Sequence, residues 1–234
     1  MITAGSVKIC SLRKPVHAEW AVEARADLFG LIFVEHAWRR ISPAEAREIV
    51  RESQRLRGTH PLRSVGVFVR SPADEVNRVA DQIALDLVQL NARDLPDNLD
   101  SIERPIIAVL RPDRGADPTA VSEQVQALHA RGGRVAAVLL DAPSATGNGG
   151  LGELSDWNLA QAVALRSSIG LAGGLNPENI GAAIAQVAPH FVDVSSGVET
   201  DREKDRRKII TFVRNARSKF ADSSIRQMDF APFG

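Results

Sequence analysis

Residues 169–195, IGLAGGLNPENIGAAIAQVAPHFVDVS, contain two short apolar runs with a helical pattern between them. The runs at 169–173 and 191–195 are apolar along most of their length instead of alternating, as strands covered on both faces of a parallel sheet are. An Asn-Pro pair, a common helix start, opens the helical pattern at 177–188. This stretch therefore predicts one strand–helix–strand unit.

The same unit recurs along the chain. Six more apolar runs precede it: VKIC (7–10), LFGLIF (28–33), SVGVFV (64–69), LVQL (87–90), IIAVL (106–110) and VAAVLL (135–140). Helical spacing fills most of the intervals, at residues 15–26, 42–56, 71–84, 117–132, 156–168 and 201–220. Eight strands alternating with helices predict a (β/α)8 TIM barrel, with an open doubly wound sheet as the alternative. None of the eight runs is polar enough for an edge strand, which favours the barrel.

The chain is expected to form one domain. No Pro/Gly/Ser-rich linker divides it, so residues 1–220 are assigned to the barrel. Residues 91–104 are the weakest connection, and we expect a short or irregular helix there. The tail at 221–234 loses the helical period, which predicts an extended or disordered terminus.

Composition excludes several classes of protein. Lys+Arg and Asp+Glu are both 29, so bulk charge favours neither a nucleic-acid nor a membrane partner. Cys10 is the only cysteine, which rules out an internal disulfide and fits a cytoplasmic protein. No secretory signal or membrane span is visible. The histidines show no ligand spacing, so no metal is expected: His17, His36, His60, His129 and His190.

Two glycine-containing loops point to a phosphate. Gly173 and Gly174 follow the seventh predicted strand, and Ser196 and Gly197 follow the eighth. Residues without a Cβ let backbone N–H groups approach an anion closely, and barrels often bind phosphate at these two loops. The alternative is a pair of tight turns that need glycine for conformation alone.

Four polar residues lie on predicted strands where a barrel carries its active site. Cys10 ends the first strand and could act as a general base, although a lone cysteine is often a small buried hydrophobe. Lys8 lies on the same face and could supply the positive charge a thiolate needs. Asp141 ends the sixth strand, where a carboxylate needs a partner or a function. Asp193, inside the eighth strand, could pair with Lys8 or bind substrate.

Two further loops could contact a ligand. Residues 142–155 are glycine-rich and could form a lid, or could simply be a flexible surface loop. Arg39 or Arg40, after the second strand, could bind a substrate carboxylate through two hydrogen bonds. The alternative is a solvated arginine pair near a helix start.

The motifs taken together resemble one enzyme family. VKIC, SVGVFV, LVQL and LLDA, the GG-x-G and DW at 149–157, LAGGLNPENI and VDVSSGVET occur in the order seen in phosphoribosylanthranilate isomerases of tryptophan biosynthesis. The similarity spans most of residues 7–217. It implies a (β/α)8 barrel without metal or cofactor that binds a phosphosugar as a monomer or homodimer.

The resemblance also implies a reaction and its residues. The family converts N-(5′-phosphoribosyl)anthranilate into 1-(2-carboxyphenylamino)-1-deoxyribulose 5-phosphate by an Amadori rearrangement. On this chain the general base is Cys10, the general acid is Asp141, and the residue that binds the anthranilate carboxylate is Arg39. The phosphate is expected on the two glycine loops.

The chain departs from the family pattern at four positions. Ser11 replaces a glycine in KICGL, Asn91 replaces the histidine of QLHG, Leu151 replaces the small hydroxyl residue of GGTG, and Trp38 stands beside Arg39. All four lie on the side expected to hold the anthranilate, while the phosphate side is intact. The alternatives are therefore a paralogue acting on another phosphosugar and a sugar-phosphate-binding barrel without catalysis.

Overall fold

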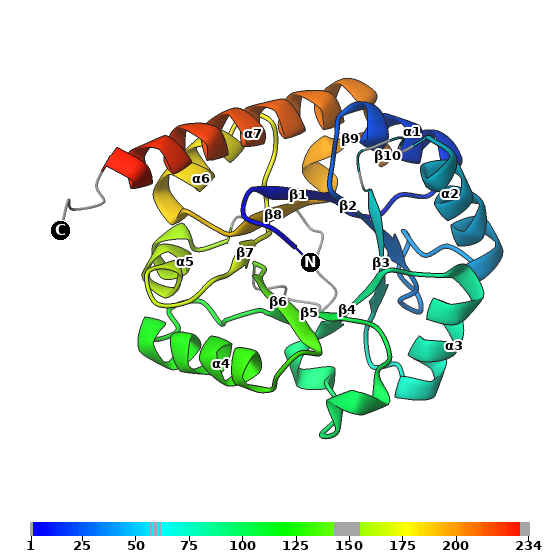
Figure 1. Cartoon of the computed structure of the whole chain (residues 1–234), viewed down its shortest axis with the longest axis horizontal. Coiled ribbons are helices and arrows are strands. Elements are labelled where there is room, and N and C mark those ends of the chain that lie inside the picture. Colours follow the sequence, from blue (N-terminus) through cyan, green and yellow to red (C-terminus); the bar gives the residue numbers. More distant parts are fainter. Residues whose placement is uncertain (1, 57, 59, 61, 143–154, 230–234) are drawn as a thin grey trace.

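Eight parallel strands close into a barrel in the order in which they occur in the chain (Figure 1). The computed structural model describes residues 2–56, 58, 60, 62–142 and 155–229. The strands are β1 (Ser6–Ile9), β2 (Leu28–Ile32), β3 (Arg63–Phe68), β4 (Leu87–Asn91), β5 (Ile106–Leu110), β6 (Val135–Leu140), β7 (Gly170–Leu171) and β8 (Phe191–Val194). β1 pairs with both β2 and β8, so the sheet has no free edge. The predicted barrel is confirmed, and the open-sheet alternative is wrong.

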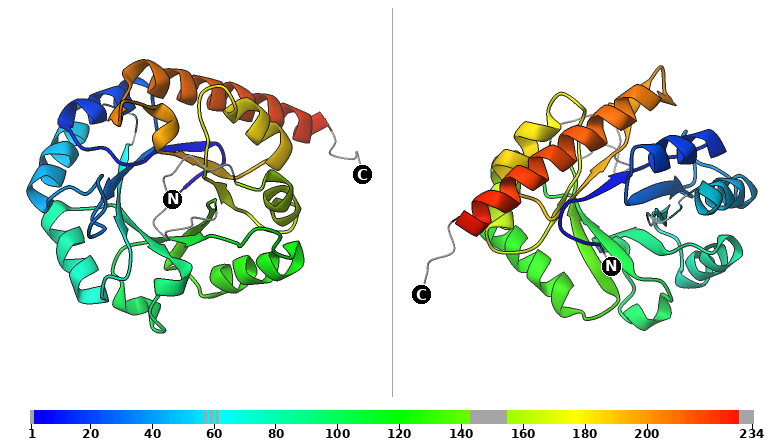
Figure 2. Two further views of the ribbon diagram at one scale, coloured as in Figure 1. Left: turned by 180° about the vertical axis from the view of Figure 1, so that it is seen from behind. Right: turned by 45° about the horizontal axis from the view of Figure 1, so that its top comes forward.

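The helices form an outer ring around the strands (Figure 2). They are α1 (Pro15–Glu23), α2 (Pro43–Leu56), α3 (Ala73–Ile83), α4 (Pro118–Ala130), α5 (Trp157–Ala164), α6 (Ile180–Val187) and α7 (Arg206–Asp229). The crossover from β4 to β5 uses two short 3₁₀ helices, η1 (Ala92–Asp94) and η2 (Leu99–Ser101), as the irregular segment 91–104 predicts. Another 3₁₀ helix, η3 (Ser196–Val198), follows β8. None of the helices in the described residues is long and apolar enough to cross a membrane.

Two element boundaries differ from the sequence expectations. α6 begins at Ile180 instead of residue 177, after a turn at 177–179 in which the Asn176 side chain accepts the N–H groups of Glu178 and Asn179 as an N-cap does. A hairpin of β9 (Glu199–Thr200) and β10 (Glu203–Lys204) occupies the segment expected to open α7.

The tail expected at 221–234 is in part helical, which corrects that prediction. α7 continues to Asp229, well past the rim of the barrel in Figure 1. No glycine or proline lies between 206 and 229 to stop it, so local propensity carries the helix on. Residues 230–234 lie outside the described residues.

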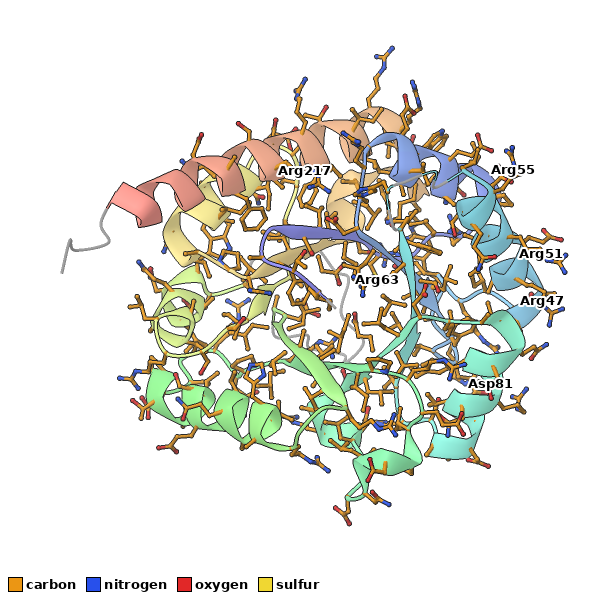
Figure 3. All side chains as sticks on the ribbon, in the orientation of Figure 1. Arg47, Arg51, Arg55, Arg63, Asp81 and Arg217 are labelled. Carbon is orange, nitrogen blue, oxygen red and sulfur yellow. The ribbon has the colours of Figure 1, made fainter. Side chains whose placement is uncertain are left out.

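α2 illustrates how local sequence makes an outer helix. Ser42 and Glu45 form the predicted capping box: the Ser42 N–H and hydroxyl donate to Glu45 Oε2 at 2.7 Å, and the Glu45 N–H donates to Ser42 Oγ at 3.3 Å. The buried face of α2 consists of Ala46, Ile49, Val50 and Ser53. On its outer side Figure 3 shows three arginines at a spacing of four residues, Arg47, Arg51 and Arg55.

The barrel interior changes from apolar to polar along the strands. The inward-facing residues near its base form one apolar cluster, which includes Leu28, Val65, Leu87, Ile107 and Phe191. A Cβ on Gly170 would lie only 2.2 Å from the Phe191 ring, so glycine leaves room for that ring. Because side chains alternate along a strand, the inward positions further on are Lys8, Gln89, Val109, Leu139 and Asp193. The polar groups therefore gather toward the carboxyl ends of the strands.

Candidate active site

The carboxyl end of the barrel brings together residues from five strands. Two positions beyond the inward-facing Lys8, Gln89, Val109 and Leu139 come Cys10, Asn91, Arg111 and Asp141. Asp193 lies beside Lys8 because β8 and β1 pair with these two residues in register. This is the face on which (β/α)8 barrels carry their active sites.

Cys10 lies buried at the end of β1. Its backbone N–H donates to Val194 O at 2.8 Å, which joins the first and last strands at the rim of the barrel. A Cβ on the neighbouring Gly30 would lie 2.6 Å from the Cys10 Sγ, so glycine at position 30 is what makes room for the thiol. Ser11, the next residue, has φ +67° and hydrogen-bonds the Ser195 hydroxyl at 2.9 Å. The glycine that the family pattern expects at position 11 fits that positive φ more readily than serine.

Lys8 and Asp193 form a buried ion pair, as their predicted facing positions allow. Lys8 Nζ donates to Asp193 Oδ2 at 2.7 Å, and Lys8 is fully buried. Burial lowers the pKa of Lys8, but the Asp193 carboxylate and then Cys10 raise it, and the net pKa is above the usual value. Among the described residues Asp193 Oδ1 is buried without a hydrogen-bond partner.

Asp141 lies across the barrel mouth and is held by an arginine. Its Oδ2 accepts from Arg111 Nε at 3.1 Å and lies 3.0 Å from Arg111 Nη2 in an ion pair, and its Oδ1 accepts from the Ala142 N–H at 2.9 Å. Arg111 Nη1 also donates to Asn91 Oδ1. Burial raises the pKa of Asp193, and the Asp141 carboxylate adds a smaller contribution in the same direction.

A cavity of about 290 Å³ opens beside Asp141. It lies between the loop after β5 and the start of α5, and its lining includes Pro112, Arg114, Leu140, Asp156 and Leu159. A carboxyl group at the wall of such a cavity can reach a small molecule within it.

The two glycine loops meet each other directly. Gly173 and Gly174 have φ of +91° and +64°, which explains why two residues without a Cβ follow β7. A Cβ on Gly197 would lie 1.9 Å from Leu175 O, so the loop after β8 rests on the backbone of the loop after β7. Within the described residues no hydrogen bond to protein uses the N–H groups of Gly173 and Gly174. Ser196 lies in η3 beside them. Backbone donors of this kind suit an anion.

Arg39 belongs to a charged cluster at the mouth. Its Nε and Nη2 donate to the two Glu199 oxygens at 3.2 and 2.8 Å, and its guanidinium stacks on the half-exposed Trp38 ring at 4.1 Å. Glu199 also accepts from buried Lys204 at 2.8 Å. Burial lowers the pKa of Lys204, although the neighbouring Glu199 carboxylate raises it.

Several of these residues were not predicted from the sequence. Arg111 directly follows β5, the same position that singled out Asp141 after β6, so strand-end position could have identified it. Glu199 and Lys204 come together only through the β9–β10 hairpin, for which the sequence gives no clear signal. The proposed lid at 142–155 falls mostly, and Leu151 entirely, outside the described residues.

Comparisons with known proteins identify the family. The family model described as N-(5'phosphoribosyl)anthranilate (PRA) isomerase matches residues 7–215. A relative named N-(5'-phosphoribosyl)anthranilate isomerase from Geobacter sp. (strain M21) is 41% identical over 212 residues, which cover 90% of this chain and 97% of the relative.

Solved structures agree with this comparison. A crystal structure of monomers generated from the dimeric phosphoribosylanthranilate isomerase of Thermotoga maritima has a TM-score of 0.72 at 31% identity and covers 91% of this chain and 98% of that one. A structure of phosphoribosyl anthranilate isomerase in complex with reduced 1-(o-carboxyphenylamino)-1-deoxyribulose 5-phosphate has a TM-score of 0.71 at 30% identity, with the same coverage. With this barrel, these strand-end residues and these relatives, the chain belongs to the phosphoribosylanthranilate isomerase family.

Proposed function

We propose that this chain catalyses the Amadori rearrangement of N-(5′-phosphoribosyl)anthranilate to 1-(2-carboxyphenylamino)-1-deoxyribulose 5-phosphate. The observation that carries the proposal is that a buried thiol directly after β1 and a carboxyl group directly after β6 both occupy inward-facing positions at the same barrel mouth. Each has charged neighbours suited to its role.

The reaction needs one acid and one base. Asp141 donates a proton to the ribose ring oxygen, the C1′–O bond breaks, and the amine lone pair forms a Schiff base. Cys10 then removes the C2′ proton, and the electron pair of that C–H bond gives an enolamine that tautomerises to the ketone. Each positioned acid or base contributes about 10²–10⁴ in rate.

Two buried lysines support the base. Lys8 and Lys204 both interact electrostatically with Cys10, and a thiol acts as a base in its anionic form. Glu199 and Asp193 in turn accept hydrogen bonds from these ammonium groups at 2.8 and 2.7 Å, which keeps both lysines in place.

The remaining residues bind the substrate. The phosphate lies on the backbone of Gly173, Gly174, Ser196 and Gly197, and binding energy gained there orients the distant C2′. Asp193 Oδ1, which has no partner among the described residues, accepts a hydrogen bond from a ribose hydroxyl.

Arg39 is the proposed partner of the anthranilate carboxylate. Glu199 orients its guanidinium through two hydrogen bonds, and Trp38 supports it from one side. All proposed residues come from one chain, so each subunit contains a whole site as a monomer or in a homodimer. We place the reaction in the cytoplasm, where Cys10 stays reduced.

Growth of a tryptophan auxotroph that lacks this isomerase tests the proposal. The wild-type chain should restore growth, and Cys10→Ser and Asp141→Asn should not. The purified variants should lose about 10²–10⁴ in kcat while their circular dichroism matches that of the wild-type chain. A folded wild-type chain that binds a phosphosugar without turnover, or turns over a different one, would replace this function by one of the two alternatives.

A further inference from the structure

Arg111 links two strand ends through a planar set of donors. Its Nε donates to Oδ2 of Asp141, its Nη2 lies 3.0 Å from the same oxygen in an ion pair, and its Nη1 donates to the side-chain oxygen of Asn91. The side chain is mostly buried, with 20% of its surface exposed, and Asp141 is 15% exposed. A guanidinium held at both edges has one orientation, since its donors form a rigid fork.

Asn91 is itself fixed. Its Nδ2 donates to Asp94 Oδ2 at 2.9 Å, and the same carboxylate oxygen accepts from the Arg70 backbone N–H at 3.1 Å. An ionised carboxylate only accepts, so the Asn91 amide must turn its nitrogen to Asp94 and its oxygen to Arg111. The hydrogen bonds therefore run without a break from the loop after β3 to the end of β6.

This arrangement distinguishes the two oxygens of Asp141. A carboxyl oxygen offers two acceptor positions. Arg111 Nε fills one on Oδ2 and its charged Nη2 lies 3.0 Å from the same oxygen, whereas the Ala142 N–H fills one on Oδ1. Among the described residues no donor fills the second acceptor position on Oδ1. A hydrogen on Oδ2 would point at the Arg111 cation, which approaches that oxygen with two nitrogens, so a protonated Asp141 carries its hydrogen on Oδ1.

We propose that Arg111 is a positioning residue for the acid: by occupying Oδ2 of Asp141 it makes Oδ1 the oxygen that gives its proton to the substrate. The inference rests on the proposed isomerase function. It gives Asn91 a purpose at the position where the family pattern has histidine, because the Asn91 amide oxygen holds the far edge of the guanidinium.

Steady-state kinetics of Arg111→Met tests the role. Without the fork the Asp141 carboxyl can rotate, and misplacement by about 1 Å costs up to about 10²-fold. We expect kcat to fall about 10- to 100-fold with KM changed less than about threefold, since substrate binding uses other groups. Arg111→Lys should recover kcat only in part, because an ammonium cannot hold both edges.

A double-mutant cycle with Asp141→Asn separates positioning from plain structural support. If Arg111 acts through Asp141, adding Arg111→Met to Asp141→Asn should lower kcat by less than about twofold. Arg134→Met is the matched control. It removes an arginine that pairs with Asp100 next to the start of β6, at the opposite end from Asp141, and should leave kcat unchanged.

Three results would overturn the inference. These are a folded Arg111→Met variant with kcat within twofold of wild type, a loss of kcat fully additive with that of Asp141→Asn, and a wild-type chain that does not isomerise. The last also ends the proposed function, whereas the first two leave it standing. If Arg111→Met does not fold, Asn91→Ala decides: kcat should fall about 3- to 10-fold, again without adding to Asp141→Asn.

Discussion

Gly197→Ala tests whether the contact between the two glycine loops holds the phosphate. The φ of Gly197 is not positive, so alanine meets no backbone strain there. The new methyl would lie 1.9 Å from Leu175 O, 2.8 Å from Leu175 C and 3.0 Å from Asn176 Cα. All three are backbone atoms and cannot rotate away. Ordinary contact begins at 3.4 Å, so the loops must separate by about 1.5 Å.

That separation sets the size of the effect. Misplacement by about 1 Å costs roughly 10²-fold, and overpacking costs about 1–3 kcal/mol of stability. We expect KM for phosphoribosylanthranilate and the inhibition constant of inorganic phosphate to rise together, by about 10- to 100-fold. Parallel changes would show that the lost interaction is the one with phosphate.

The assay combines steady-state kinetics, competition by phosphate and urea unfolding. Gly181→Ala is the control, because a Cβ at this position in α6 meets nothing within 4 Å and alanine favours the helix by about 0.5–1 kcal/mol. Its KM should equal that of the wild-type chain. A folded Gly197→Ala variant with both constants within twofold of wild type would refute the reasoning.

Two more predictions concern the thiol and the pH dependence of stability. Gly30→Ala places a methyl 2.6 Å from the Cys10 Sγ, so kcat should fall at least about tenfold with little change in the phosphate inhibition constant; unchanged kcat would contradict this packing. Burial lowers the pKa of His17 to about 4 from 6.5, and the ring accepts the Arg13 N–H at Nδ1. The unfolded state therefore takes up this proton at a higher pH than the folded state. The free energy of unfolding should be fully present above pH 6.5 and should fall by up to about 3 kcal/mol as the pH drops toward 4. In urea unfolding at several pH values His17→Gln should show a shallower decline, and equal slopes would count against the assignment.

Much of the fold could be predicted because each strand and helix carries a local signal. The apolar runs have the length and aliphatic content of strands buried on both faces, and caps such as Ser42 with Glu45 mark helix starts. The differences lie at element boundaries. A turn capped by Asn176 precedes α6, and the residues after Val198 form a hairpin that pairs Glu199 with Lys204.

The candidate site was only partly predictable for a related reason. Strand-end position and the alternation of side chains are enough to place Lys8 beside Asp193. That Asp141 pairs with Arg111 and Arg39 with Glu199 depends on contacts between strands and loops that no local pattern encodes. Arg111 directly follows a strand and could have been named as a candidate, whereas Glu199 emerged only with the structure.

The buried ion pair between Lys8 and Asp193 has a consequence for synthesis of the chain. Its members lie 185 residues apart, on the first and last strands of the barrel. A nascent chain that has not yet released β8 from the ribosome has no counter-charge for Lys8, and an uncompensated buried charge costs about 3–5 kcal/mol. Early burial of β1 is therefore unfavourable, and we expect barrel closure, and with it assembly of the catalytic mouth, to wait until β8 is available.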